Sequence, residues 1–304
     1  AVMKNKKNDL VSVIIPTFSR PYNLERAIKS TLSQTYKNIE IIIVDDNGIG
    51  SKYQIETEKA IRNYIKKGEV KYIKHDINKN GATARNTGLK ASKGIYVNFL
   101  DDDDEFLPDK IKNQVDLLEK NIKYAACCCD SIIQYHHHQD IVKCQQNGNL
   151  IEAILSGNAH FNTSSVLFRR NALEELNGFD ESFRRHQDWE LYIRFFRKYL
   201  MISTFQMPLL IKHVTTTSVI TNEPLKQIEY LEFFLNKYKM DFETYQKKNA
   251  IYQYLYLNLA NSLVYYGKYR IGLEYLKKAY SFQNPKIKNL IENVVVFLKS
   301  FIRK

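Results

Sequence analysis

The amino-acid sequence predicts an α/β protein with a mostly parallel central sheet flanked by helices, followed by an α-helical C-terminal extension. In roughly the first hundred residues, short apolar runs alternate with segments of helical period. Continuous apolar runs of this kind are typical of parallel strands that are buried on both faces. From about residue 222, glycine and proline almost vanish and the apolar period becomes helical. We therefore expect one domain over residues 1–220 and a helical extension over residues 221–304.

Each expected strand is a short β-branched run, and each expected helix has apolar residues at helical spacing. Strands are predicted at Leu10–Ile15, Ile39–Val44, Val70–Lys74, Ile95–Leu100, Tyr124–Tyr135 and Ser164–Phe168. Helices of the first domain are predicted at Asn23–Gln34, Ser51–Lys66, Ala82–Ala91, Pro108–Asn121 and Arg185–Tyr199. Helices of the extension are predicted at Tyr230–Tyr238, Phe242–Tyr266, Tyr269–Ser281 and Lys286–Ile302.

The composition limits the class of protein. The chain of 304 residues is 44% hydrophobic and 26% charged, which is typical of a globular protein and excludes a disordered one. No apolar run has the roughly 20 residues that a membrane span needs. Lys and Arg exceed Asp and Glu by 45 to 33, which gives a net charge of +12. This charge favours an anionic partner, and nucleic acid, acidic lipid and a phosphorylated small molecule all qualify.

The cysteines and the N-terminal residues indicate which cellular compartment to expect for this protein. Residues 1–9 are polar and lack the apolar core of a secretory signal. Three of the four cysteines are consecutive, Cys127–Cys129, and the fourth is Cys144. Because this arrangement suits no disulfide framework, we expect a reducing compartment. A zinc site is not expected, since neighbouring residues of a strand point to opposite faces and no C-x-x-C pair is present.

Polar clusters follow three of the predicted strands, at Thr17–Arg20, Asp45–Asn47 and Asp101–Asp104. In an open α/β sheet, ligands bind beyond the carboxyl ends of the strands. Four adjacent carboxylates repel one another unless a cation compensates their charge. Carboxylates suit Mg²⁺ or Mn²⁺, and these ions often join a protein to a diphosphate. The sequence therefore predicts a divalent cation at this edge of the sheet.

A series of motifs then follows in order along residues 10–215: Val13-Ile-Ile-Pro-Thr-Phe, Ile43-Val-Asp-Asp-Asn, Gly81-Ala-Thr-Ala-Arg-Asn-Thr-Gly88, Phe99-Leu-Asp-Asp-Asp-Asp, Ser165-Val-Leu-Phe-Arg-Arg, Gly178-Phe-Asp and Gln187-Asp-Trp-Glu-Leu. Their order and spacing resemble those of glycosyltransferase family 2. The resemblance implies a GT-A nucleotide-sugar-binding fold, a UDP-hexose donor, Mn²⁺ or Mg²⁺ as cofactor, and transfer with inversion.

The resemblance also implies roles for single residues of the donor site. Pro16 and Thr17 are expected to line the nucleotide pocket. Asp45 matches the aspartate that contacts the base, and Asp46 is its neighbour. Arg85 matches a residue that helps to hold both the nucleotide and the acidic loop.

In the acidic loop, the resemblance assigns Asp101, Asp102 and Asp103 to the family's Asp-X-Asp motif. Asp101 is then expected to face the ribose and Asp103 to reach the metal. Asp104 matches a frequent fourth acid near the donor sugar. His213 matches a histidine that serves as a third metal ligand in some relatives, although a single histidine also suits a structural role.

Asp188 matches the aspartate proposed as the catalytic base. A carboxylate beside an acceptor hydroxyl can take its proton as the new bond forms. The family usually has Glu-Asp where this chain has Gln187-Asp188, so the base is kept and a neighbouring charge is lost. An acidic residue in the first turn of a helix is also favoured by the helix dipole. Trp189, the only tryptophan, suits either an acceptor sugar or the core.

The segment Lys286–Lys304 is basic and amphipathic, and it suits either an anionic membrane interface or packing on the preceding helices. With the family resemblance, this segment predicts a cytoplasmic enzyme at the inner face of the cell membrane. Its expected partner is a glycan or lipid-linked acceptor of surface polysaccharide synthesis, such as O-antigen, lipooligosaccharide or capsule.

Two other functions remain open alternatives. A sugar nucleotidyltransferase also uses an α/β sheet and paired acids, but it generally needs a glycine-rich loop after the first strand. Here Pro16-Thr-Phe-Ser-Arg-Pro21 has no glycine. A basic nucleic-acid-binding protein fits the net charge but not the acidic cluster, so no nucleic acid is expected as partner.

Overall fold

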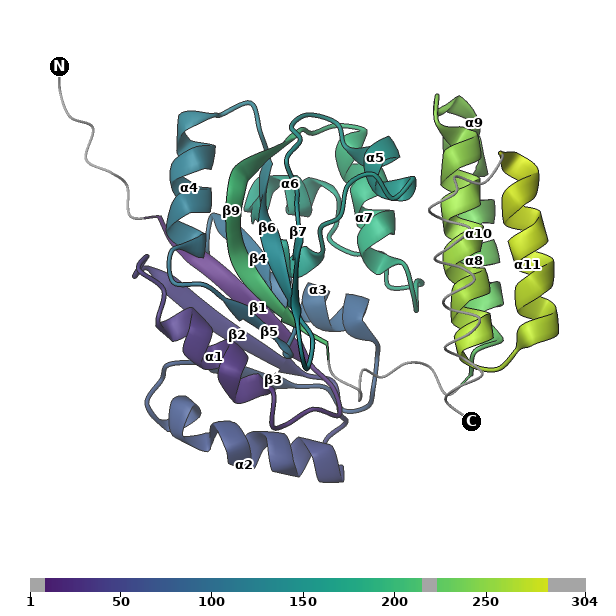
Figure 1. Ribbon diagram of the computed structural model, residues 1–304. Helices are drawn as coiled ribbons and strands as arrows, with labels where there is room; N and C mark the ends of the chain where they lie inside the picture. The colour runs from purple at the N-terminus through teal and green to yellow at the C-terminus, as the bar shows by residue number, and fades with distance from the viewer. Residues whose placement is uncertain (1–8, 215–222, 284–304) are drawn as a thin grey trace, which may run out of the picture. The chain divides into compact units, whose positions relative to one another are not determined.

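The structure of the chain, a computed structural model, describes residues 9–214 and 223–283 (Figure 1). It consists of two compact units. The first comprises residues 1–150 and 160–216, and the second comprises residues 151–159 and 217–304. The expected helix at 286–302, with its membrane contact, and the N-terminal residues 1–8 lie outside the described part of the chain.

One mixed sheet forms the centre of the first unit, and its first half is parallel as the sequence predicts. The strands β3, β2, β1 and β4 lie in this order and pair in parallel. Their bounds are β1 Val11–Thr17, β2 Ile39–Asp45, β3 Lys71–Lys74 and β4 Tyr96–Phe99. Because Thr17 lies opposite Asp45 in the register, the ends of β1 and β2 meet at the same edge.

The sheet continues from β4 through β8, β6 and β9 to β5, with both antiparallel and parallel pairs. The bounds are β5 Asp104–Phe106, β6 Ala126–Gln134, β8 Val166–Arg169 and β9 Met201–His213. A short strand, β7 (Gln139–Val142), pairs with the end of β6. The expected strands at Tyr124–Tyr135 and Ser164–Phe168 are therefore confirmed as β6 and β8, whereas β5 and β9 were not expected.

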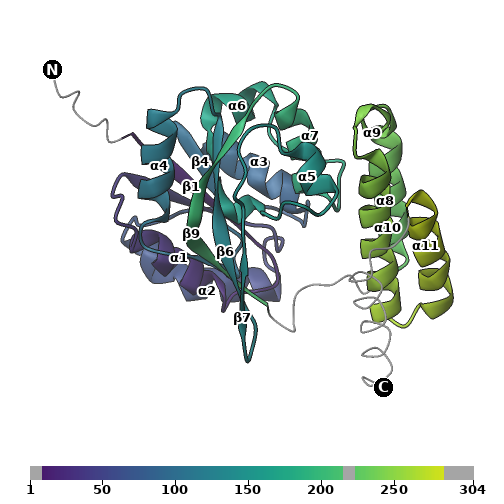
Figure 2. The same cartoon turned by 45° about the horizontal axis from the view of Figure 1, so that its top comes forward.

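Helices cover both faces of the sheet (Figures 1 and 2). Apolar residues of α1, α2 and α4 join one core cluster with β1, β2 and β6. On the other face, α3 packs so closely on β1 that a Cβ at Gly88 would lie 2.3 Å from Ile14. Helices α6 and α7 also flank the sheet, and Phe168 of β8 contacts Phe195 of α7. The bounds are α1 Leu24–Leu32, α2 Lys52–Lys66, α3 Gly81–Ala91, α4 Lys110–Lys120, α6 Arg170–Glu175 and α7 Gln187–Phe196.

The second unit is helical in its described residues. Its bounds are α5 Ile151–Leu155, α8 Lys226–Lys237, α9 Lys239–Thr244, α10 Lys248–Tyr265 and α11 Tyr269–Phe282. The expected helix Phe242–Tyr266 is thus divided into α9 and α10. Gly267, with a φ of 75°, joins α10 to α11 in the left-handed conformation that glycine favours. None of the described helices is both long and apolar enough to cross a membrane.

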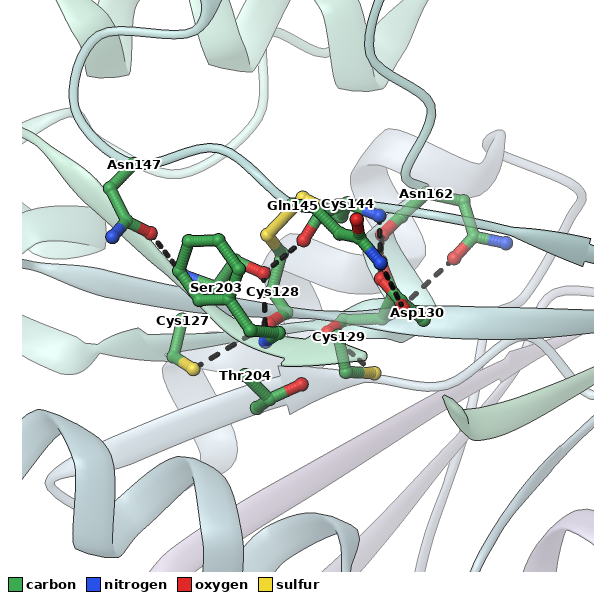
Figure 3. The surroundings of a disulfide bond; sticks show 12 residues. Cys127, Cys128, Cys129, Asp130, Cys144, Gln145, Asn147, Asn162, Ser203 and Thr204 are labelled. Carbon is green, nitrogen blue, oxygen red and sulfur yellow. Dashed lines mark hydrogen bonds between the residues drawn. A yellow bond between two sulfur atoms is a disulfide. The ribbon is translucent and has the colours of Figure 1, made fainter. Parts of the chain in front are cut away.

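The cysteines contradict the prediction that the chain has no disulfide. Cys128 of β6 and Cys144 form a disulfide with Cα atoms 6.7 Å apart (Figure 3). Cys127 and Cys129 are free and buried, and they lie in the core cluster on the α4 side of the sheet. Strand alternation therefore turns only the middle cysteine toward Cys144. The prediction that this arrangement suits no disulfide was wrong, because consecutive cysteines do not prevent one of them from pairing.

Candidate active site

The predicted polar clusters meet at the edge of the sheet. Pro16 and Thr17 end β1, and the Thr17 hydroxyl donates to Asp102 Oδ2 across 2.7 Å. Both Thr17 and Asp102 are buried. This bond fixes the acidic run directly beyond the first strand.

Asp45 ends β2, Asp46 follows it, and both hold the neighbouring loops. Asp45 Oδ1 accepts from the backbone and the side chain of Asn47, and Oδ2 accepts from the Tyr72 hydroxyl at 2.5 Å. Both oxygens of Asp46 accept hydrogen bonds from the segment 75–80, including the backbone N–H groups of Lys79 and Asn80. Both aspartates thus hold protein groups that surround the end of β2.

The anchored segment sets the start of α3. Asn80 caps this helix, and its side chain accepts from the N–H groups of Ala82 and Thr83. One turn later, Arg85 donates to Asp101 Oδ1 at 2.7 Å and to Gln187 Oε1 at 3.1 Å. A Cβ at Gly81 would lie 3.0 Å from Arg85 Nη1, so glycine leaves room for this bridge. Asp46 therefore helps to position Arg85 through the start of α3.

Two arginines hold the centre of the acidic run. Arg20 forms ion pairs with Asp102 at 2.9 Å and with Asp103. Arg26 of α1 donates to the backbone carbonyl of Asp103 at 2.8 Å. Burial raises the pKa values of Asp102 and Asp104 to about 7. Mutual repulsion among the carboxylates contributes to both shifts, so the run is under electrostatic stress.

Asp101 differs from its neighbours. Burial alone would raise the pKa of Asp101, but Arg85 and Lys212 outweigh it and hold the pKa below its ordinary value. Asp101 is therefore ionised at neutral pH.

The predicted metal ligands do not form a closed cage. Among the described residues, no three side chains of His, Cys, Asp or Glu are grouped so that they could hold a metal ion. His213 lies 3.2 Å from Glu105, and Asp103 pairs with Arg20. The Asp103 side chain remains 15% exposed. The Asp101 side chain is 24% exposed. Partly exposed carboxylates fit an ion such as Mg²⁺ or Mn²⁺, which takes one or two protein carboxylates and completes its shell with water and substrate phosphates.

A pocket of about 270 Å³ joins the acidic run to the start of α7. It is lined by Arg85, Asp101, Asn162, Thr163, Phe179, Arg184, Arg185, His186, Gln187, Asp188 and Lys212. Of the predicted site residues, Arg85, Asp101 and Asp188 therefore share one pocket. Pro16, Thr17, Asp45, Asp46, Asp102, Asp103, Asp104 and His213 are not among its lining residues.

Asp188 stands in the first turn of α7. Burial raises the pKa of its carboxyl, while the Trp189 N–H donates to Oδ1 at 2.9 Å. His186, just before the helix, has a φ of 61°, and its ring stacks on Trp189 with centroids 4.8 Å apart. A left-handed backbone is costly for a histidine, and such strain often occurs at functional sites. Asp188 is thus a carboxylate with raised proton affinity in a pocket beside an ionised acid.

The sequence motifs predict no role for two of the cations at this site, Arg20 and Lys212. Arg20 lies in a predicted polar cluster, but its pairing with the acidic run depends on the fold. Lys212 lies on β9, where Pro208 and left-handed residues at Phe205 and Gln206 disturb the strand pattern. No signal in the sequence would have placed Lys212 opposite the acidic run.

Known proteins resemble this chain in sequence and in fold. The model of glycosyl transferase family 2 matches residues 12–176, more than half of the chain. The chain belongs to this family. An uncharacterized glycosyltransferase of Rickettsia prowazekii is 32% identical over 242 residues, which cover 75% of this chain and 71% of that protein.

Two other relatives of this family member have names that state a glycosyltransferase activity. The amylovoran biosynthesis glycosyltransferase AmsB of Erwinia amylovora is 28% identical over 67% of this chain and 70% of its own length. The UDP-Glc:alpha-D-GlcNAc-diphosphoundecaprenol beta-1,3-glucosyltransferase WfaP of Escherichia coli is 41% identical over 36% of this chain and 42% of its own length. Some relatives are much longer, and the match spans 27% of an uncharacterized glycosyltransferase of Rickettsia bellii.

Solved structures confirm the GT-A fold. The S. aureus TarS fragment 1-349 in complex with UDP-GlcNAc has a TM-score of 0.59 at 16% identity, with 96% of this chain and 81% of that chain covered. The mannosyltransferase PcManGT from Pyrobaculum calidifontis, in complex with GDP-Man and Mn²⁺, has a TM-score of 0.61 at 16% identity. That match covers 97% of this chain and 86% of PcManGT. At these identities the likeness concerns the fold alone.

Proposed function

We propose that this family member is a metal-dependent, inverting glycosyltransferase. It moves a hexose from a UDP-sugar to a hydroxyl of a lipid-linked glycan in surface polysaccharide synthesis. One observation carries the proposal: the carboxylate Asp188 and the ionised Asp101 of the acidic run line the same pocket. A base and a donor-binding acid must be close together when a donor and an acceptor react directly.

The proposed chemistry is a single displacement. The acceptor hydroxyl oxygen forms a bond to the anomeric carbon, and the bond from that carbon to the diphosphate breaks. The hydroxyl proton passes to the carboxylate of Asp188, whose raised pKa favours its acceptance. Because the attack comes from the face opposite the leaving group, the anomeric configuration inverts.

Several residues are proposed to hold the donor. Pro16, Thr17, Asp45 and Asp46 surround the nucleotide at the ends of β1 and β2. Arg85, Asp101 and Asp102 hold the ribose side of the donor, and Asp104 belongs to the same acidic run. Asp103, with His213 as a further ligand, holds Mn²⁺ or Mg²⁺. A bound divalent ion would stabilise negative charge on the departing diphosphate.

The proposed substrates are those for which relatives are named or with which similar structures were solved. WfaP is named for UDP-Glc and a GlcNAc-diphosphoundecaprenol acceptor, and the TarS fragment was solved with UDP-GlcNAc. PcManGT was solved with GDP-Man and Mn²⁺, so guanosine donors belong in any test panel. We propose residues 1–220 as the catalytic domain. The helical extension, 221–304, is proposed to bring that domain to the inner face of the cell membrane, where a lipid-linked acceptor lies.

A panel of nucleotide sugars tests the function. The full chain is incubated with Mn²⁺ and UDP-, GDP- or dTDP-sugars, and release of the nucleoside diphosphate is measured with and without an undecaprenyl-diphosphate glycan. We expect release from a UDP-hexose that rises with the acceptor and stops in chelator. Pyrophosphate release from UTP and a sugar 1-phosphate would instead identify a nucleotidyltransferase. The absence of both reactions would contradict the proposal.

A further inference from the structure

Lys212 occupies a special position in the first unit. It lies on β9 directly opposite Asp104 of β5 in the antiparallel register. Side chains of directly opposed residues in an antiparallel pair lie on the same face, with Cβ atoms about 5 Å apart. Lys212 lines the pocket that holds Asp188, whereas Asp104 is fully buried and is not among the lining residues. Asp104 therefore lies beside Lys212, away from the pocket.

Asp104 is a buried carboxylate that depends on its neighbours for charge compensation. Both of its carboxylate oxygens are buried, and neither accepts a hydrogen bond of normal geometry from the described residues. Burying a charged carboxylate is costly unless a cation lies nearby. Lys212, opposite Asp104 on β9, places an ammonium beside it and at the wall of the pocket.

The charge of the pocket indicates what this ammonium can bind. Four basic side chains line it, Arg85, Arg184, Arg185 and Lys212, against two acidic ones, Asp101 and Asp188. The formal charge of the lining is therefore four minus two, or +2. Burial lowers the pKa of His186 to about 3, so that imidazole is neutral and adds nothing at neutral pH. A pocket of this charge suits an anionic ligand.

We propose that Lys212 binds the diphosphate of the donor and of the departing nucleotide, and that Asp104 is the positioning residue that holds Lys212 in place. This inference rests on the proposed function. An ammonium is a compact point charge and a common ligand of phosphate groups. As the bond to the anomeric carbon breaks, negative charge grows on the diphosphate. A fixed ammonium beside it stabilises the transition state more than the bound donor, which raises the rate.

This assignment gives Asp104 a different role from that of a sugar-binding acid. If Asp104 acts through Lys212, its loss weakens diphosphate binding only while Lys212 is present. If Asp104 contacts the sugar itself, its loss acts independently of Lys212. A double-mutant cycle separates these two roles, because coupled residues show non-additive effects.

The experiment is calorimetric titration of UDP and UMP in the presence of a chelator, so that no divalent ion contributes. The proteins are the full-length wild type, Lys212→Met, Lys212→Arg, Asp104→Asn and the double variant Asp104→Asn/Lys212→Met. Lys90→Met, an exposed lysine outside the pocket, is the matched control. Melting temperatures are measured for all six proteins.

We expect Lys212→Met to reduce the preference for UDP over UMP by about 10- to 100-fold, as for loss of a charged hydrogen bond. Lys212→Arg should restore part of the preference, and Lys90→Met should not change it. Asp104→Asn should reduce the preference less, and it should have no further effect in the Lys212→Met background. An unchanged preference in Lys212→Met would overturn the inference and leave the proposed function standing. A wild type that binds no nucleoside diphosphate even with Mn²⁺ in place of the chelator, with GDP and dTDP also tested, would overturn both.

Discussion

Arg85 of α3 donates a hydrogen bond to Asp101 across 2.7 Å, and the same guanidinium reaches Gln187 at 3.1 Å. One side chain thereby links the acidic run after β4 to the first turn of α7, where Asp188 stands. The glutamine carbonyl accepts this bond as a carboxylate would, but without its charge. Gln187 therefore retains the Arg85 bridge at the position where the family usually has glutamate.

The lost charge gives a first prediction. Gln187→Glu should keep the bridge to Arg85 and place a negative charge next to Asp188. A like charge favours the protonated form of a carboxylate, so the pKa of Asp188 should rise. The acidic limb of the kcat/KM profile should then move to higher pH by about one unit. Initial rates between pH 5 and 8 measure this, with Gln139→Glu on β7 as control. A limb that moves to lower pH, or not at all, would contradict Asp188 as the titrating group.

A second prediction concerns the divalent ion. Asp103→Ala should abolish the dependence of UDP binding on Mn²⁺, because the proposed metal-binding carboxylate is then missing. Transfer should fall to the level that the wild type shows in chelator. Calorimetric titration of UDP with and without Mn²⁺ measures the effect, and Asp140→Ala on β7 is the control. Activity of the wild type that persists unchanged in chelator would exclude a metal-dependent reaction.

The disulfide gives a third prediction. Cys128 and Cys144 are 16 residues apart, and a cross-link closing a loop of this length stabilises a protein by about 3 kcal/mol. Cys144→Ser should lower the free energy of unfolding by roughly that amount, and reductant should lower it in the wild type but not in the variant. Urea denaturation measures both. Thiol titration of the denatured, unreduced chain should find two of the four cysteines reactive. Four reactive thiols would show that the bond does not form.

Lys110 gives a fourth prediction, on stability and pH. The side chain is fully buried, and its ammonium donates to Asn98 and Gln114. Burial lowers the pKa of Lys110 to about 8, against an ordinary 10.5. Between these two pH values the unfolded chain binds more protons than the folded chain. The free energy of unfolding therefore rises with pH across this window, and below pH 8 this lysine adds no slope.

The matched comparison is Lys110→Met, which lacks the titrating group. Between pH 8 and 10, the stability of the wild type relative to this variant should increase by about 2–3 kcal/mol. Urea denaturation at each pH gives the difference. A difference that stays constant over this range would show that Lys110 has an ordinary pKa in the folded protein.

The sequence predicts the first half of the sheet because its strands are continuous apolar runs with clear ends. Thr17, Asp45 and Asp101 could be placed at one edge for the same reason, since parallel strands end together. β9 could not be predicted, because its pattern is interrupted and its pairing with β5 joins residues about a hundred positions apart. The position of Lys212 opposite Asp104 follows from that pairing alone, and sequence spacing carries no trace of it.

The disulfide was missed for a related reason. Alternation along β6 places Cys128 on the opposite face of the sheet from Cys127 and Cys129. Cys128 is thereby left opposite Cys144, but only the fold brings that residue close.

The rate of transfer by Asp188→Asn tests the central claim most directly. The amide keeps the shape of the side chain but cannot take the acceptor proton, so transfer should fall by about 10²–10⁴-fold. The dissociation constant of UDP and the melting temperature should barely change. Asp101→Asn, measured beside it, should instead weaken UDP binding, because Asp101 is proposed to hold the donor. Transfer by Asp188→Asn near the wild-type rate would contradict the account and show that the carboxylate of Asp188 is structural.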